Sequence, residues 1–226
     1  MISIPSAFSA SYAQARVKFL EAAATASTRI ESVNHPLPGR DGEQLAMDVA
    51  LDGAAGSEHL LIVSSACHGV EGFCGSGVQV FALHDQDWRA KARDAGVAVL
   101  YIHALNPWGF SHIRRVTQEN VDLNRNFRDF HAPPPANPLY DELAGLLVPP
   151  TWPPSAEVNA ALARFVAERG MPALQQAITA GQYAHPEGLF YGGHDPTWSQ
   201  VTLRHVLQSH GQRCKRLAWI DLHTGL

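Results

Sequence analysis

Short apolar runs alternate along the chain with segments of helical periodicity. Buried strands are predicted at residues 60–66 and 97–103, because both are continuous apolar runs of strand length bounded by turn residues. Residues 8–26 carry apolar side chains at helical spacing, and helices are also expected at 72–83 and 86–95. Strands that alternate with helices indicate a mostly parallel sheet covered by helices on both faces.

A predicted hairpin and a predicted final strand add three strands to this sheet. Residues 29–35 and 46–51 read as strands, and the Pro- and Gly-rich turn between them predicts an antiparallel hairpin. Residues 215–223 are predicted to form a final strand. The expected fold is therefore α/β, a three-layer αβα sandwich with a mixed, mostly parallel central sheet.

The stretch between the fourth and fifth predicted strands is less regular. Residues 106–152 read as a long irregular region with proline-rich pieces, and long ordered loops are usually functional. Two helices are expected over 155–180, split near Gly170, followed by a Gly-rich loop over 181–194 and a helix capped by Thr197. Because no repeat or linker interrupts the pattern, a single domain over residues 1–226 is predicted.

Composition and charge exclude several classes of protein. Of the 226 residues, 46% are apolar and 17% are charged, which is typical of a globular protein. The net charge of −4 offers no electrostatic footprint for a nucleic acid, so no nucleic-acid partner is expected. No apolar run reaches membrane-spanning length and no signal peptide is recognisable, so neither a membrane nor export is expected. The three cysteines form no regular framework, which favours reduced thiols and a cytoplasmic location.

Candidate chemistry begins where the strand at 60–66 ends. His68 and Glu71 follow that strand directly, and sites in open α/β sheets form at the carboxyl ends of strands. An imidazole and a carboxylate at such a position are ligands that zinc accepts. Cys67 is adjacent to His68, but neighbouring residues at a strand end point to opposite faces, so Cys67 is expected to pack into the sheet.

A second candidate pair, Asp221 and His223, lies on the final strand. Strand alternation puts both side chains on one side, and a metal-bound imidazole usually donates its other N–H to a carboxylate. A strand-end histidine capped by a local aspartate is the alternative. Two interpretations are also open for the arginines of the long loop. They could form a solvent-exposed charged surface, or they could bind a carboxylate with two hydrogen bonds from one guanidinium.

The order of these motifs resembles that of the zinc carboxypeptidase superfamily, and in particular a poorly characterised bacterial branch of it. The resemblance extends from about residue 46 to the end of the chain. The motifs that carry it are His68-x-x-Glu71, Asn106-Pro-x-Gly109, Arg115, Asp122-Leu-Asn124-Arg125-Asn126-Phe127 and the strand-borne His223.

The resemblance implies a role for each of these residues. His68, Glu71 and His223 would bind one zinc ion per chain, with water as the fourth ligand. Two histidines and one glutamate leave an open tetrahedral position, as in catalytic zinc sites. Of the remaining residues, Asp122 would accept a hydrogen bond from His68 and Arg115 would stabilise the oxyanion. Asn124 and Arg125 would bind the substrate's terminal carboxylate.

The resemblance also implies a function and a departure from the family. The expected activity is a zinc-dependent hydrolase of carboxypeptidase type that cleaves an amide beside a free carboxylate in a peptide or acyl-amino-acid substrate. In that family the general base is a Glu on a strand after the third ligand, and no matching segment follows His223 before Leu226. The carboxypeptidase-like sandwich is therefore expected to lack its C-terminal strands, to be weakly active or inactive, and to self-associate through the final strand.

Two alternatives remain open at this point. One is a zinc deacylase or amidase that uses the same site on small acylated amino acids or cell-wall peptides. The other is a metal-binding module without turnover, which the missing base would favour.

Overall fold

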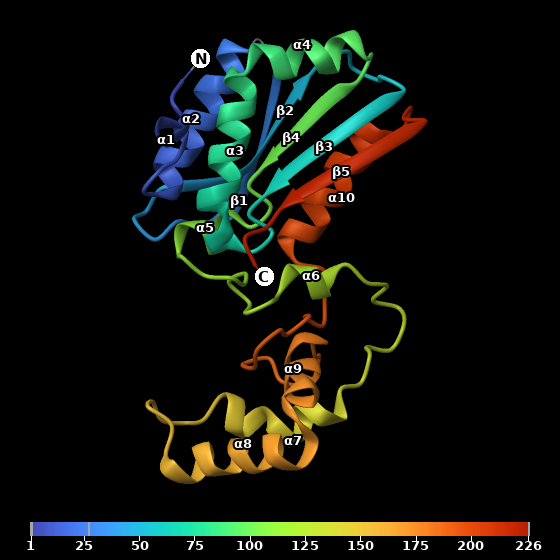
Figure 1. The fold of residues 1–226 in the computed structure, drawn as a ribbon. Coiled ribbons are helices and arrows are strands. Elements are labelled where there is room, and N and C mark those ends of the chain that lie inside the picture. Colours follow the sequence, from blue (N-terminus) through green and yellow to red (C-terminus); the bar gives the residue numbers. More distant parts are fainter. Residues whose placement is uncertain (1, 27, 226) are drawn as a thin grey trace. The chain divides into compact units, whose positions relative to one another are not determined.

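The computed structural model describes residues 2–26 and 28–225, and it divides into two compact units. The first, here called the sheet unit, runs through Gln118 and resumes at Trp198. The second, here called the helical unit, spans Glu119–Thr197. Figure 1 shows the strands gathered in the sheet unit, and each unit is described by itself below.

One five-stranded sheet forms the centre of the sheet unit. Its strands lie in the order β1-β2-β4-β3-β5, and the strand bounds are β1 Arg29–Pro38, β2 Gln44–Asp52, β3 His59–Ser65, β4 Ala98–His103 and β5 Arg216–Leu222. The predicted hairpin is present as the antiparallel β1–β2 pair, and β2 also pairs antiparallel with β4. β3 pairs in parallel with β4 and with β5, so the expected mixed sheet is confirmed.

Helices flank this sheet on two sides (Figure 1). The helices on one face are α1 (Ile4–Ala7), α2 (Tyr12–Thr25), α3 (Gly72–His84) and α4 (Gln86–Asp94). Phe19 of α2 and Val80 of α3 are buried there in one cluster with Val63 of β3 and Tyr101 of β4. On the opposite face, Ile62 of β3 and Leu207 of α10 (Trp198–Gly211) line the same small cavity. The predicted three-layer arrangement is therefore present in the sheet unit.

A buried glutamine joins α3 to the carboxyl ends of the two central parallel strands. The side-chain amide of Gln79 donates to the carbonyl of Val63 at 2.9 Å and to that of Ile102 at 3.0 Å. Its oxygen accepts from the Ser65 hydroxyl at 2.9 Å. Because all these groups are buried and paired, they hold α3 against the sheet near the carboxyl ends of β3 and β4.

The helical unit contains α6 (Leu123–Asn126), α7 (Pro138–Leu147), α8 (Ala156–Arg169) and α9 (Met171–Thr179). The predicted split between two helices is confirmed at Gly170, which has a φ of 84° that favours glycine. The expectation of an irregular region over 106–152 is wrong in part, because α6 and α7 lie there, as does α5 (Pro107–Ser111) of the sheet unit. No helix in the described part of the chain is both long and apolar enough to cross a membrane.

Candidate metal centre

The centre lies where β3 ends and the chain turns into α3. Ala66 has a φ of 59°, which is uncommon for a residue with a side chain, and this turn redirects the backbone after the strand. His68 then precedes a 3-10 turn, Gly69–Glu71, which leads directly into α3. The β3–β5 register places Ser65 opposite Leu222, so His223 follows β5 at the same edge of the sheet.

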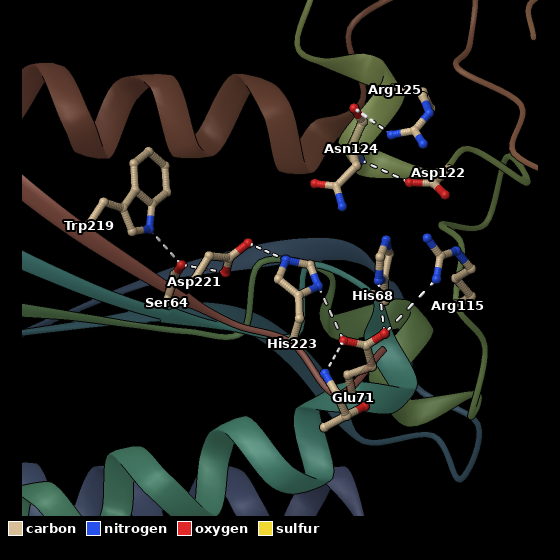
Figure 2. A network of polar contacts seen from close by, with 11 residues as sticks. Ser64, His68, Glu71, Arg115, Asp122, Asn124, Arg125, Trp219, Asp221 and His223 are labelled. Atoms are coloured by element: carbon tan, nitrogen blue, oxygen red, sulfur yellow. Dashed lines mark hydrogen bonds and ion pairs between the residues drawn. The ribbon is translucent and has the colours of Figure 1, made fainter. Parts of the chain in front are cut away.

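The carboxylate of Glu71 lies between two imidazoles (Figure 2). Its Oε1 is 2.9 Å from Nδ1 of His68, and its Oε2 is 3.2 Å from Nδ1 of His223. The backbone N–H of Thr224 also donates to Oε2 at 2.8 Å. Ligand-type atoms of His68, Glu71 and His223 all lie within 4.8 Å of one another, so the structure brings together the three residues predicted to bind metal.

The surroundings of Glu71 favour its charged form. Burial of this side chain raises its pKa, but the hydrogen bonds from Thr224 and His68 and the nearby histidine charges lower it by more. The net result is a pKa below the usual value for a glutamate. The centre therefore offers an ionised carboxylate beside two imidazoles.

A row of polar side chains runs from His223 back into the sheet. Nε2 of His223 is 2.7 Å from Oδ2 of Asp221, as the sequence predicted for a carboxylate partner. Oδ1 of Asp221 accepts from the Ser64 hydroxyl at 2.6 Å, and that hydroxyl oxygen accepts from the indole N–H of Trp219 at 2.7 Å. Figure 2 shows this row continuing to Glu71.

Arg115 reaches the centre because its loop is fixed by backbone contacts. The N–H of Gly69 donates to the carbonyl of Arg115 at 3.1 Å, and the side chain of Asn106 caps α5 by accepting from the Gly109 N–H at 2.8 Å. The Asn106 amide also donates to the Arg115 carbonyl at 3.4 Å. A guanidinium nitrogen of Arg115 lies 4.0 Å from Oε1 of Glu71, so the predicted oxyanion-stabilising residue is beside the predicted ligands.

The other predicted site residues, Asp122, Asn124 and Arg125, belong to the helical unit. Oδ1 of Asp122 accepts from the Asn124 N–H at 3.0 Å and so caps α6. The guanidinium of Arg125 lies over the ring of Phe190, 5.9 Å from its centroid, and donates to the carbonyl of Thr179. Their expected roles toward substrate and toward His68 remain predictions.

Sequence reasoning missed two residues of the centre, Ser64 and Trp219. Trp219 shares the alternation of Asp221 and His223, which was visible in the sequence, but the position of Ser64 depends on the register between β3 and β5. Cys67 is buried, as expected, yet its sulfur also lies within 4.8 Å of ligand-type atoms of Asp221 and His223.

Solved structures similar to this chain include two peptidases. Carboxypeptidase A from Helicoverpa armigera aligns with 95% of this chain and 46% of its own, at 14% identity and a TM-score of 0.52. A metallo-carboxypeptidase from Burkholderia cenocepacia aligns with 91% of this chain and 59% of its own, at 13% identity and a TM-score of 0.36. The first likeness shows a carboxypeptidase-like fold, and the chain spans about half the length of that protein.

Among curated proteins no sequence matches this chain. A family profile does match, over residues 8–226 and thus nearly the whole sequence. The chain belongs to the family described as DUF2817, proteins of unknown function.

Proposed function

We propose that this chain carries the metal centre of a zinc-dependent hydrolase of carboxypeptidase type, with His68, Glu71 and His223 as ligands. The observation that carries the proposal is the approach of two imidazole nitrogens to one ionised carboxylate at the carboxyl ends of two parallel strands. The carboxypeptidase-like fold supports the same assignment.

The hydrogen-bonding partners of His223 explain why a cation suits the position between His223 and Glu71. Asp221 accepts hydrogen bonds only, so Nε2 of His223 must donate across the 2.7 Å contact between them. A neutral His223 then presents an unprotonated Nδ1 to Oε2 of Glu71, which is also an acceptor, at 3.2 Å. Two acceptors at this distance repel each other unless a proton or a cation lies against both. A metal ion satisfies both groups without a charged imidazole.

The ligand set fits zinc better than a hard cation. Zinc accepts imidazole nitrogen and carboxylate oxygen at about 2.0–2.2 Å in a tetrahedral arrangement, which requires ligand atoms roughly 3.4 Å apart. The nitrogen–oxygen distances of 2.9 and 3.2 Å are close to that spacing. Two histidines and one carboxylate leave a fourth position open, which is typical of catalytic sites. When bound, zinc lowers the pKa of water and polarises a carbonyl group.

The remaining predicted residues are assigned further roles in amide hydrolysis. Arg115, with a side chain that is 39% exposed, presents donors beside the ligands, where they can stabilise negative charge on a carbonyl oxygen. Asn124 and Arg125 are proposed to bind the free carboxylate of a peptide or acylated amino acid, since a guanidinium suits bidentate binding of a carboxylate. Asp122 is proposed to accept from His68 and so to orient its ring.

Metal analysis of the purified protein tests the assignment first. We expect about one zinc per wild-type chain, a loss of binding in His68→Ala and in His223→Ala, and unchanged binding in His131→Ala, which alters an exposed histidine of the helical unit. A wild type that binds no divalent metal, or a His68→Ala variant that binds as well, contradicts the ligand assignment.

A substrate test follows on the loaded protein. Peptides and acylated amino acids are compared with the same compounds amidated at the carboxyl end. Turnover only of the free acids supports the carboxypeptidase-type assignment, and equal turnover of both sets contradicts it. Metal binding without turnover of either set would favour the binding module over the hydrolase and would leave the ligand assignment intact.

A further inference from the structure

We propose that Trp219 and Ser64 are positioning residues that fix the tautomer of His223 and thereby raise the affinity of the centre for metal. Neither residue contacts the proposed metal, and both act through Asp221. The part of this inference that concerns metal affinity rests on the proposed function, whereas the part that concerns the tautomer does not.

The two strands place these side chains on one face of the sheet. Trp219, Asp221 and His223 alternate along β5 and its extension, so their side chains share a face. Ser64 of β3 is the register partner of Asp221 in the parallel β3–β5 pair. Ser64 therefore lies between the indole of Trp219 and the carboxylate of Asp221, as Figure 2 shows.

The indole N–H of Trp219 sets the direction of every hydrogen bond in the row that runs from Trp219 to His223. An indole N–H can only donate, so the Ser64 oxygen must accept from Trp219 at 2.7 Å. The hydroxyl proton of Ser64 is then directed to Oδ1 of Asp221 at 2.6 Å. The other oxygen of Asp221 accepts from Nε2–H of His223 at 2.7 Å. The proton of a neutral His223 is thus held on Nε2, and Nδ1 is left to face Glu71.

Burial makes this order costly to rearrange. Ser64 is fully buried, so its hydroxyl cannot exchange its protein partners for bulk water. Without the Trp219 N–H, the Ser64 oxygen loses a donor and the hydroxyl is freer to turn away from Asp221. Asp221 then holds Nε2–H less firmly, and the Nδ1–H tautomer, which cannot bind metal through Nδ1, gains population.

The expected size of the effect follows from related groups. Removing a hydrogen-bond partner of a metal-binding histidine typically lowers metal affinity by about 10–100-fold. We expect a loss in that range for Asp221→Asn. Trp219 and Ser64 act one step further away, so we expect smaller losses of about 3–10-fold for Trp219→Phe and Ser64→Ala, on the same reasoning.

The proposal is incompatible with an alternative set of metal ligands. Cys67, Asp221 and His223 could instead hold a metal through the Cys67 thiolate and Nε2 of His223. In that arrangement Nε2 carries no proton and Asp221 is a ligand. Replacing Cys67 with Ser would then reduce metal binding, whereas the proposed positioning role requires unchanged binding.

The experiment combines two measurements on the full chain. Zinc affinity is determined by competition with a chromophoric chelator. The His223 tautomer is read from ¹⁵N chemical shifts of histidine-labelled, zinc-free protein at a pH high enough for the imidazole to be neutral. The variants are Trp219→Phe, which removes the N–H but keeps an aromatic ring, Ser64→Ala, and Ser64→Thr, which keeps the hydroxyl. Trp152→Phe is the matched control, because Trp152 is 86% exposed and lies in the helical unit.

We expect the Nε2–H tautomer in the wild type, in Ser64→Thr and in Trp152→Phe, with unchanged zinc affinity. In Trp219→Phe and Ser64→Ala we expect a mixed tautomer population and the weaker binding given above. Wild-type tautomer and affinity in Trp219→Phe, an Nδ1–H tautomer in the wild type, or loss of zinc in Cys67→Ser would each overturn the proposal. Because the tautomer is measured without metal, a wild type that binds no zinc refutes the proposed function and still leaves the positioning role tested.

Discussion

Gly69 lies so close to Gly109 that a Cβ at position 69 would be 2.1 Å from the carbonyl carbon of Gly109. The 3-10 turn that carries Glu71 therefore packs directly on the backbone of α5. This contact also holds the Arg115 loop, because the Gly69 N–H donates to the Arg115 carbonyl. The position of the guanidinium beside Glu71 thus depends on the absence of a side chain at residue 69.

Gly69→Ala is expected to separate this turn from α5. Because the atoms in the way are backbone atoms, the strain should lower the free energy of unfolding by about 1–3 kcal/mol and weaken metal binding. Urea denaturation and zinc titration measure the two effects. The control is Gly211→Ala in α10, where a Cβ meets nothing within 4 Å and stability should change by about 1 kcal/mol or less. Equal behaviour of both variants would show that the Gly69 contact is unimportant.

Breaking the Arg16–Asp48 ion pair is expected to destabilise the sheet unit strongly. Nε of Arg16 is 2.8 Å from Oδ2 of Asp48, and the Asp48 side chain is fully buried. Arg16→Met should lower the free energy of unfolding by ~3–5 kcal/mol, because it leaves a buried charge without its partner. Arg93→Met, which breaks an exposed pair with Asp94, should change it by about 1 kcal/mol or less. Chemical denaturation of both variants decides between these values.

Stability is expected to fall in weak acid because of His103. Burial lowers the pKa of His103 from 6.5 to about 4, and the charges of Asp48 and Arg16 modify it in opposite directions. Between these two values the unfolded chain takes up a proton that the folded chain does not. The stabilising contribution of neutral His103 is therefore complete above about pH 6.5 and is lost as the pH falls toward 4.

The variant His103→Gln tests this assignment through the slope of stability against pH. Its amide can still bond to the Ser76 hydroxyl, which lies 2.9 Å from Nε2 of His103. We expect a shallower decline between pH 6.5 and 4 than in the wild type, whereas His131→Gln, at an exposed position, should keep the wild-type slope. Parallel curves for His103→Gln and the wild type would assign the acid sensitivity to other groups.

The outer edge of β5 is expected to pair with a second chain. Among the described strands β5 pairs only with β3, and Leu217, Trp219 and Ile220 are 52%, 41% and 48% exposed. Exposed apolar edge strands invite pairing with another strand. Light scattering should detect self-association that Leu217→Lys reduces and that Val201→Lys, on the exposed surface of α10, does not. A monomer at all concentrations tested would contradict this expectation.

Local pattern was enough to predict the strands of the sheet. The runs that form β3 and β4 are continuous and apolar, and the turn between β1 and β2 is rich in proline and glycine. The short helices α5 and α7 were missed because each is set by a cap, Asn106-Pro107 or Asn137-Pro138, and not by a long periodic face. Such caps were present in the sequence, but a long proline-rich region obscured them.

The candidate site was predictable where its residues lie on or just after a predicted strand, or in a motif that resembles those of the zinc carboxypeptidases. His68 and Glu71 were found because they directly follow a predicted strand, and His223 because it ends the final predicted strand; the structure brings the three together. Ser64 was not found, since its contact with Asp221 joins residues 157 positions apart and depends on strand register. The hydrogen bond from Thr224 to Glu71 was missed for the same reason.

Because β3 pairs in parallel with β5, the proposed metal would link two segments that are far apart in the sequence. The contact between Glu71 and His223 joins residues 152 positions apart, and closing a loop of that length has a large entropic cost. The ion can bind tightly only when Glu71 and His223 are both in place, so it binds the folded state and not the unfolded one. Free metal at about 100 times its dissociation constant would then add about 2.7 kcal/mol to the free energy of unfolding. Metal availability would thus control what fraction of the protein has β5 paired with the sheet, as well as whether the centre can act.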